Sequence, residues 1–301
     1  MVNKVRIWDT LCWLVGLTQG TTDKHILFRH IFSLMRSIYA AFVLLLVLMC
    51  IPVLGQVEKG QTTEGAAWYE KAIDSYNKGF YDSAIIYFDS YLEMRPSDTD
   101  ALNYKGLALK NLGKYDEAIK SFDQAIGINP QDADALFNKG QILVLQSKYE
   151  EAIVVLDQVI AINPRNANAL YIKGLVLNEL SKYNEAIEAF NDAIEINPQH
   201  GDAWYSKGIS LDKLSKFNES VKAYDNVIRI NPQDANAWFG KGNALYDLSM
   251  YDDAITAYDN AIQIDPKFAS AWHNKGLALE ALGKKSESEA AFVKEKEIGL
   301  S

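Results

Sequence analysis

The chain has 301 residues, of which 49% are hydrophobic and 23% are charged, and its net charge is −9. This composition is typical of a folded protein and argues against extensive disorder. The acidic excess falls after residue 64, and it would repel phosphate backbones, so the charge argues against a nucleic-acid partner.

Residues 1–34 precede a long uncharged stretch and are interpreted as an N-terminal extension. They lie in the cytoplasm or, if translation starts at Met35, are not translated at all. Both cysteines, Cys12 and Cys50, precede residue 65. The later part of the chain therefore cannot form an internal disulfide and must be stable through packing alone.

Residues 35–56 are predicted to be a signal peptide or a transmembrane anchor. The 18 residues 38–55 carry no charge, and as a helix they would span about 27 Å, close to the ~30 Å hydrocarbon core of a bilayer. Arg36 stands before them, which favours a cytoplasmic N-terminal side. The rest of the chain is then expected on the extracytoplasmic side.

Whether this segment is cleaved stays open. Residues 53–55 before Gln56 resemble a signal-peptidase site, which favours a cleaved leader and a secreted product. The 34 preceding residues suit an uncut anchor better, with contact to the membrane through residues 38–55. A short linker, residues 57–64, follows in either case.

Six of the seven prolines recur at intervals of 34 residues: Pro96, Pro130, Pro164, Pro198, Pro232 and Pro266. Counting back from them divides residues 65–301 into seven repeats, which start at 65, 99, 133, 167, 201, 235 and 269. A fixed period of this length indicates stacked supersecondary units rather than an ordinary helical bundle.

The first half of each repeat has helical spacing. The fourth position is large, and the eighth is glycine in all copies after the first: Gly106, Gly140, Gly174, Gly208, Gly242 and Gly276. Glycine inside a helix costs ~1 kcal/mol against alanine, so its recurrence predicts a close helix–helix approach.

A second helix is predicted after a turn at the fifteenth position, which holds Gly79, Gly113, Ser147, Ser181, Ser215, Ser249 or Gly283. In the second repeat its inner face would be Ala118, Ile119, Phe122, Ala125 and Ile126, an amphipathic stripe. Its N-terminus is expected to be capped by Asp82, Asp116, Asn184, Asn218 or Asp252. Asn129 is expected to adopt a left-handed turn at its end.

The repeat resembles the tetratricopeptide repeat family. In the sixth copy the family pattern reads Trp238, Gly242, Leu245, Ala254, Tyr258, Ala261 and Pro266. Seven copies in one register cover residues 65–301. The resemblance implies an all-α fold, a right-handed superhelical solenoid of antiparallel helix pairs whose first helices line a concave groove.

Every copy has lysine at the seventh position, where the family usually has leucine: Lys71, Lys105, Lys139, Lys173, Lys207, Lys241 and Lys275. Five copies have aspartate at the twenty-fifth position: Asp89, Asp123, Asp157, Asp225 and Asp259. This pairing suggests a ladder of Lys–Asp contacts between helices. Alternatively, the lysine stems cover the core while the ammonium groups point to water.

The second helix of the last repeat becomes polar, with Lys285, Ser288 and Glu289 at formerly apolar positions. A stack of repeats must end in a face that needs no neighbour. We therefore expect the array to end at this repeat.

The resemblance implies a partner-binding groove formed by residues at three positions of the first helices. The fifth positions hold Tyr69, Asn103, Phe137, Tyr171, Tyr205, Phe239 and His273. The ninth and twelfth positions add Gln141, Asn178, Asp212, Asn243, Tyr246 and Glu280. Aromatic rings among amides and carboxylates suit an extended peptide or a partner helix. Alternatively, some rings merely pack on the neighbouring repeat.

The second, fifth and sixth positions carry no lysine or arginine, whereas chaperone-binding members of the family use such residues to hold a C-terminal carboxylate. The expected partner is therefore a protein or peptide that is neutral or basic rather than acidic-tailed.

No catalytic pattern occurs, and neither a cofactor nor a metal is expected. Residues 65–301 contain no cysteine and no pair of histidines at ligand spacing within a repeat. Gly-rich phosphate loops, HExxH and GxSxG are also missing from the sequence. The sequence thus predicts a non-catalytic adaptor outside the cytoplasmic membrane. The alternatives are a self-associating structural protein of the envelope and an accessory subunit of an envelope enzyme such as a glycosyltransferase.

Overall fold

The computed structural model of the protein describes residues 64–299, and in that range every element is a helix. The chain divides into two units, Met1–Ala66 and Ala67–Ser301, and the repeats make up the second. The hydrophobic helix predicted over residues 38–55 lies outside the described residues. None of the described helices is long and apolar enough to cross a membrane.

The described residues form seven pairs of helices. The first helix of each pair covers residues 64–77, α4 (Thr99–Asn111), α6 (Ala133–Leu145), α8 (Ala167–Glu179), α10 (Gly201–Lys213), α12 (Ala235–Asp247) and α14 (Ala269–Ala281). The second helices are α3 (Tyr81–Met94), α5 (Tyr115–Ile128), α7 (Tyr149–Ile162), α9 (Tyr183–Ile196), α11 (Phe217–Ile230), α13 (Tyr251–Ile264) and α15 (Lys285–Gly299). The predicted all-α solenoid of helix pairs is confirmed.

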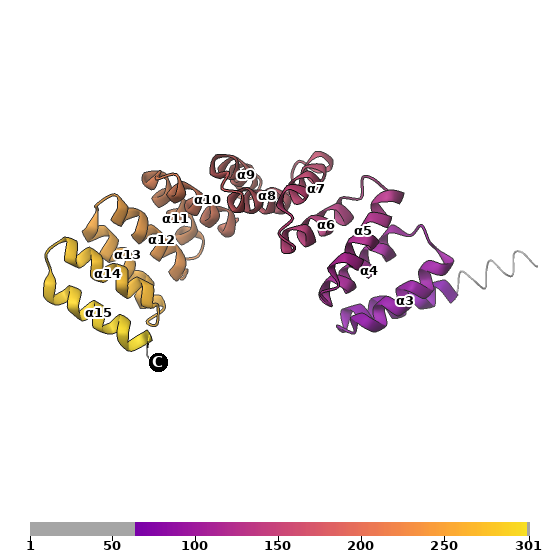
Figure 1. Ribbon diagram of the computed structural model, residues 1–301, viewed down its shortest axis with the longest axis horizontal. Helices are drawn as coiled ribbons and strands as arrows, with labels where there is room; N and C mark the ends of the chain where they lie inside the picture. The colour runs from indigo at the N-terminus through magenta and orange to yellow at the C-terminus, as the bar shows by residue number, and fades with distance from the viewer. Residues whose placement is uncertain (1–63, 300–301) are drawn as a thin grey trace, which may run out of the picture. The chain divides into compact units, whose positions relative to one another are not determined.

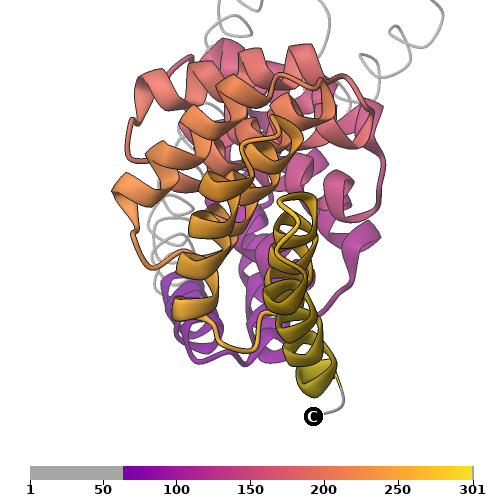
Figure 2. The same cartoon turned by 90° about the vertical axis from the view of Figure 1, so that its left-hand side faces the viewer.

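The helix pairs follow one another in a curved row (Figure 1). Each helix from α3 onward contacts the next, and α4, α6, α8, α10, α12 and α14 also contact one another in succession. Successive second helices within α3–α15 make no such contacts. The first helices therefore lie on the inner side of the curve, and Figure 2 shows the row from the end at which α15 lies.

Glycine at the eighth position lets an aromatic ring from the second helix approach the first helix closely. A Cβ atom at Gly106 would lie only 2.6 Å from Cε1 of Phe122, which is fully buried. The third repeat is looser, because a Cβ at Gly140 would lie 3.3 Å from Cδ2 of Leu156. The close helix approach predicted from the glycines is confirmed.

The turn between the two helices uses left-handed backbone at the fifteenth position in every copy. The φ angles are 72–79° at the glycines and 56–60° at the serines, from Gly79 to Gly283. Left-handed backbone suits glycine best, because a side chain crowds the following carbonyl. The turn predicted at this position is confirmed.

The predicted caps of the second helices are wrong. Asp82 lies inside the first turn of α3, and the N-cap residue Phe80 makes no side-chain capping bond. Asn129 is not left-handed either, because its φ is −126° and its Oδ1 accepts a hydrogen bond from the Gln131 amide. Side-chain caps instead occur on first helices, for example Asp98 on α4.

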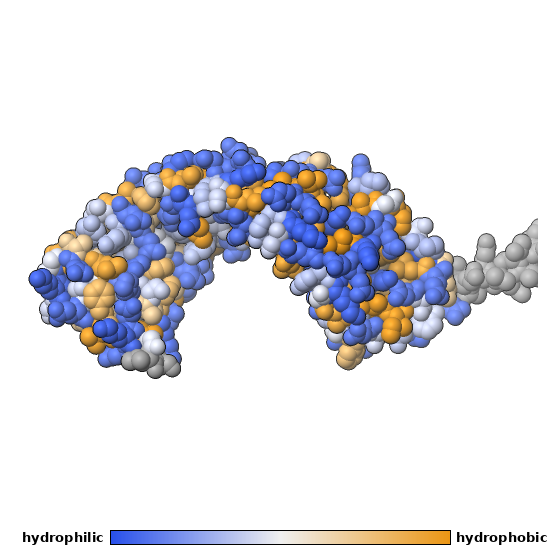
Figure 3. Space-filling view, viewed as in Figure 1, coloured by the Kyte–Doolittle hydropathy of each residue, from blue (hydrophilic) through white to orange (hydrophobic). Residues whose placement is uncertain are grey.

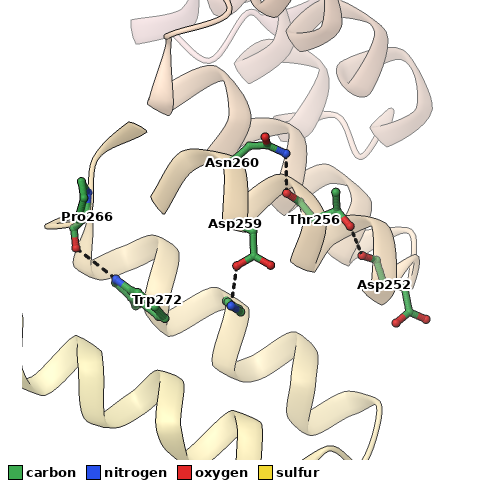
Figure 4. Close-up of polar contacts among 7 residues, drawn as sticks. Asp252, Thr256, Asp259, Asn260, Pro266 and Trp272 are labelled. Carbon is green, nitrogen blue, oxygen red and sulfur yellow. Dashed lines mark hydrogen bonds and ion pairs between the residues drawn. The ribbon is translucent and has the colours of Figure 1, made fainter. Parts of the chain in front are cut away.

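The ladder of Lys–Asp contacts is confirmed. Five lysines lie within 2.5–2.7 Å of the aspartate sixteen residues earlier, which belongs to the preceding repeat: Lys105–Asp89, Lys139–Asp123, Lys173–Asp157, Lys241–Asp225 and Lys275–Asp259. Figure 4 shows the contact made by Asp259. It also shows Trp272, whose Nε1 donates to the carbonyl oxygen of Pro266 at 3.3 Å.

One rung of the ladder is missing between the fourth and fifth repeats. Asn191 stands where the other copies have aspartate, and Lys207 makes no ion pair within the described residues. Lys207 Nζ lies instead 5.0 Å from the centre of the Trp204 ring. Burial lowers the pKa of Lys207.

Candidate functional site on the inner surface

The name inner surface is used here for the fifth, ninth and twelfth positions of the first helices, the groove positions predicted from the sequence. These helices lie on the inner side of the curved row. Figure 3 draws one side of the row, where hydrophobic and hydrophilic residues are intermixed.

The aromatic rings at the fifth positions are half-buried and rest on the core. Tyr205 packs edge-on against Tyr224 with a centroid distance of 5.5 Å, and Tyr171 lies 6.1 Å from Phe190. Phe239 lies 6.0 Å from Tyr258 and also contacts Phe268 at 4.9 Å. Phe137 is likewise half-buried against the core of its own repeat. The rings of Tyr171, Tyr205 and Phe239 thus pack within their own repeats rather than on the neighbouring repeat, and part of each remains exposed.

The ends of the inner surface are also aromatic. Tyr69 packs on Tyr91 at 5.0 Å, and Tyr246 packs on Tyr251 at 5.3 Å. His273 lies 5.6 Å from the ring of Phe292, and its Nδ1 is 3.0 Å from Glu295 Oε2. This carboxylate fixes the orientation of the imidazole.

Asn103 is more buried than the other residues at the fifth positions. Its side chain is buried, and Nδ2 donates to Oδ2 of Asp132 at 2.9 Å. Asp132 in turn caps α6 by accepting from the Ala135 amide. Asn103 thus supports a helix cap, and little of it is exposed for a ligand.

Three amides of the predicted set share one arrangement: each uses its oxygen within the array. Gln141 Oε1 accepts from Lys110 Nζ at 3.2 Å, and Asn178 Oδ1 accepts from Ser210 Oγ at 2.8 Å. Asn243 Oδ1 accepts from both Tyr258 and Asn274.

The amide nitrogens of Gln141, Asn178 and Asn243 have no hydrogen-bond partner among the described residues. They are also not among the side-chain atoms that are buried without a partner. They are therefore open to solvent, and because the oxygens are held, the nitrogens have a fixed orientation. The result is a row of side-chain donors along α6, α8 and α12.

Asp212 is a half-buried acid on α10. Tyr224 donates a hydrogen bond to its Oδ2 at 2.8 Å, whereas Oδ1 is buried without a partner. Burial raises the pKa of the Asp212 carboxyl above its usual range. Asp212 therefore contributes more to the packing of the fifth repeat than to an open surface.

Sequence reasoning missed the residues that hold the amides in place. Lys110, Ser210 and Asn274 each reach across to the neighbouring repeat. Lys110 occupies a twelfth position, and Ser210 and Asn274 occupy tenth and sixth positions next to the predicted ones, so knowledge of which helices are neighbours would have found them. Within residues 64–299, no group of three His, Cys, Asp or Glu side chains could hold a metal.

Two family models match the described region. The model of the TPR repeat matches residues 211–249 and 242–283. The model of anaphase-promoting complex, cyclosome, subunit 3 matches twice in tandem, at residues 77–159 and 149–227. The chain therefore contains tetratricopeptide repeats. Since the second model matches twice side by side, it reports the repeat rather than that particular subunit.

Several solved structures have a similar fold. YrrB, described as a TPR protein with an unusual peptide-binding site, is 22% identical, with a TM-score of 0.57 over 62% of this chain and 97% of its own. MamA is 25% identical, with a TM-score of 0.52 over 53% of this chain and 94% of its own. A tetratricopeptide repeat protein from Parabacteroides merdae ATCC 43184 is 20% identical, with a TM-score of 0.60 over 79% and 94%. No curated protein matches this chain significantly.

Proposed function

We propose that this tetratricopeptide repeat protein is a non-catalytic adaptor that binds an extended peptide segment along its inner surface. The observation that carries the proposal is the row of solvent-facing amide nitrogens on Gln141, Asn178 and Asn243. Such donors need acceptors, and the backbone carbonyls of an extended peptide supply them at regular intervals. A helical partner offers fewer, because its carbonyls are bonded internally.

The aromatic rings supply the apolar part of the surface. Tyr171, Tyr205 and Phe239 are fixed by the core, so they lose little conformational freedom when a partner covers them. Asp100, Asp134 and Asp202 lie in the first turns of α4, α6 and α10. We therefore infer a partner that is neutral or basic.

The place of action belongs to the same proposal. The uncharged residues 38–55 and the basic residues before them favour an array held outside the cytoplasmic membrane. YrrB is described as having a peptide-binding site, and peptide binding by a protein of the same fold is in keeping with the proposed role.

Affinity capture from native cell extract with the full chain tests the proposal. Replacing Gln141, Asn178 and Asn243 together by alanine should abolish capture of a partner, because the donors are gone. The matched control replaces Gln124, Gln158 and Asn191 on the second helices, whose amides are exposed, and should leave capture unchanged. Circular dichroism checks that both variants keep their helices.

Equal capture by both triple variants would overturn the proposal, as would the lack of any captured protein. Concentration-dependent self-association without another partner, measured by sedimentation velocity, would favour the structural role instead. Mass spectrometry of the mature N-terminus tests the location, because cleavage after residue 55 would exclude an anchor.

A further inference from the structure

A cavity of about 330 Å³ opens beside Tyr205, between α10, α11 and α12. Its wall includes Gly201, Asp202, Tyr205, Val227, Ile230 and Asp234. None of its lining residues is basic. The cavity thus combines an apolar wall, an aromatic ring and two carboxylates.

Asp234 caps a helix as equivalent aspartates of earlier repeats do, but its second carboxylate oxygen accepts no hydrogen bond within the described residues. Its Oδ1 accepts from the Ala237 amide at 3.0 Å and so caps α12. Asp98 and Asp132 cap α4 and α6 in the same way, but their Oδ2 atoms are occupied, by the Tyr91 hydroxyl at 2.6 Å and by Asn103 Nδ2 at 2.9 Å. Asp234 Oδ2 has no partner among the described residues.

The residues that donate to the second oxygens of Asp98 and Asp132 have no equivalent donor in the fifth repeat. Val227 stands where the first repeat has Tyr91, and Tyr205 stands where the second has Asn103. Valine has no donor, and the Tyr205 hydroxyl makes no hydrogen bond with the carboxylate in the structure. Both residues line the cavity, and so does Asp234.

Gly201 leaves the cavity open. The equivalent position holds Gly65, Thr99, Ala133, Ala167, Ala235 or Ala269 in the other repeats, and a Cβ at Gly201 would meet no atom within 4 Å. A side chain placed there would therefore enter empty space rather than clash with the fold.

We propose that this cavity binds the basic side chain, lysine or arginine, of the peptide that lies on the inner surface. This inference rests on the proposed function and names one residue of its partner. The methylene stem would lie on Val227 and Ile230, and the cation would donate to Asp234 and face the Tyr205 ring. Charge complementarity decides for this occupant, because the lining residues carry two acids and no base.

A small probe tests the cavity without knowledge of the partner. The ¹⁵N-labelled full chain is titrated with N-acetyl-arginine amide, with N-acetyl-lysine amide and, as a neutral matched control, with N-acetyl-citrulline amide. The arginine or lysine probe should shift the backbone amides of Gly201, Asp202 and Asn236 saturably. Citrulline should bind at least fivefold more weakly, and equal binding of citrulline would overturn the proposal.

Two variants locate the effect. Asp234→Asn keeps the cap, as Asn166 does on α8, but removes the charge, so it should weaken probe binding at least fivefold. Gly201→Leu fills the cavity and should abolish binding. The control Asp98→Asn changes an equivalent cap whose second oxygen is occupied, and it should change binding less than twofold. Equal loss in both asparagine variants would overturn the proposal, and thermal melting shows whether each variant folds.

The same variants separate this inference from the proposed function. If the triple amide variant loses its captured partner while Gly201→Leu and Asp234→Asn retain it fully, the cavity proposal fails and the adaptor stands. If the charged probes bind as described and no partner is captured, the adaptor role fails and the cavity remains a cation site of unknown use.

Discussion

The hydroxyl of Tyr224 donates a hydrogen bond to Asp212 inside an interface between two repeats, at a distance of 2.8 Å. Two glycines make room for the ring, since Cβ atoms at Gly208 and Gly240 would lie 2.8 Å and 2.7 Å from it. The fifth and sixth repeats therefore meet at the buried ring of Tyr224, whose hydroxyl is held by a half-buried acid of the fifth repeat.

The half-buried Asp212 should make stability depend on pH. Burial raises the pKa of Asp212 in the folded state, so the folded chain binds more protons than the unfolded chain above about pH 4. The free energy of unfolding should then fall as pH rises through this range. Asp212→Asn should flatten that decline, which urea titrations between pH 4 and 7 measure. An unchanged pH slope in the variant would contradict the assignment.

Two glycines at the same position should respond differently to alanine. At Gly106 the added methyl would lie 2.6 Å from the Phe122 ring, so overpacking should cost ~1–3 kcal/mol and outweigh a helix-propensity gain of ~1 kcal/mol. At Gly140 the nearest atom is the flexible end of Leu156, at 3.3 Å. Gly140→Ala should therefore be neutral or stabilising. Chemical denaturation checks both, and equal changes would show that ring packing does not select glycine.

The missing rung of the ladder can be restored. Asn191→Asp places a carboxylate sixteen residues before Lys207, the spacing of all five observed pairs. Stability should rise by ~0–1 kcal/mol, because the pair is partly exposed. The gain should disappear in 1 M salt, because the Debye length falls to ~3 Å and the attraction between the two charges is then screened. A double-mutant cycle with Lys207→Met measures the coupling, which should be near zero if the two side chains do not meet.

The serine turns should be improved by glycine. Ser147 has a φ of 56°, where a side chain costs ~1–2 kcal/mol and glycine loses only ~0.5–1 kcal/mol of chain entropy. Ser147→Gly should thus raise the free energy of unfolding by up to about 1 kcal/mol. The reverse change, Gly113→Ser, should lower the free energy of unfolding by a similar amount. Thermal melts measure both variants, and a change in the same direction in both would contradict the prediction.

Features that depend on one repeat and its period could be read from the sequence. The proline spacing predicted the helix pairs, and Gly106 predicted the close approach of a second helix. The repeat positions of Lys139 and Asp123 predicted their ion pair. Each of these features is fixed by short-range geometry. The caps could not be placed this way. Asp82 failed because α3 begins at Tyr81, two residues earlier than a cap at Asp82 requires, and shifts this small leave no mark on the hydrophobic pattern.

The inner surface was only partly predictable. The fifth-position rings could be placed on the correct helices, but their exposure depends on Phe190, Tyr224 and Tyr258 beneath them. The cavity beside Tyr205 could not be predicted from the sequence. Its special feature is the lack of a donor to the second oxygen of Asp234, and this shows only by comparison with the structure, where Tyr91 donates to Asp98 and Asn103 donates to Asp132.

Each helix from α3 to α15 contacts only helices within two places of it along the chain. Tension applied to the two ends would therefore load the interfaces in series, with no long-range contact to hold distant segments together. Under stretching, the helix pairs should therefore separate one at a time. When the tension is released, each pair should dock again on its sequence neighbour, so that the extension is reversible.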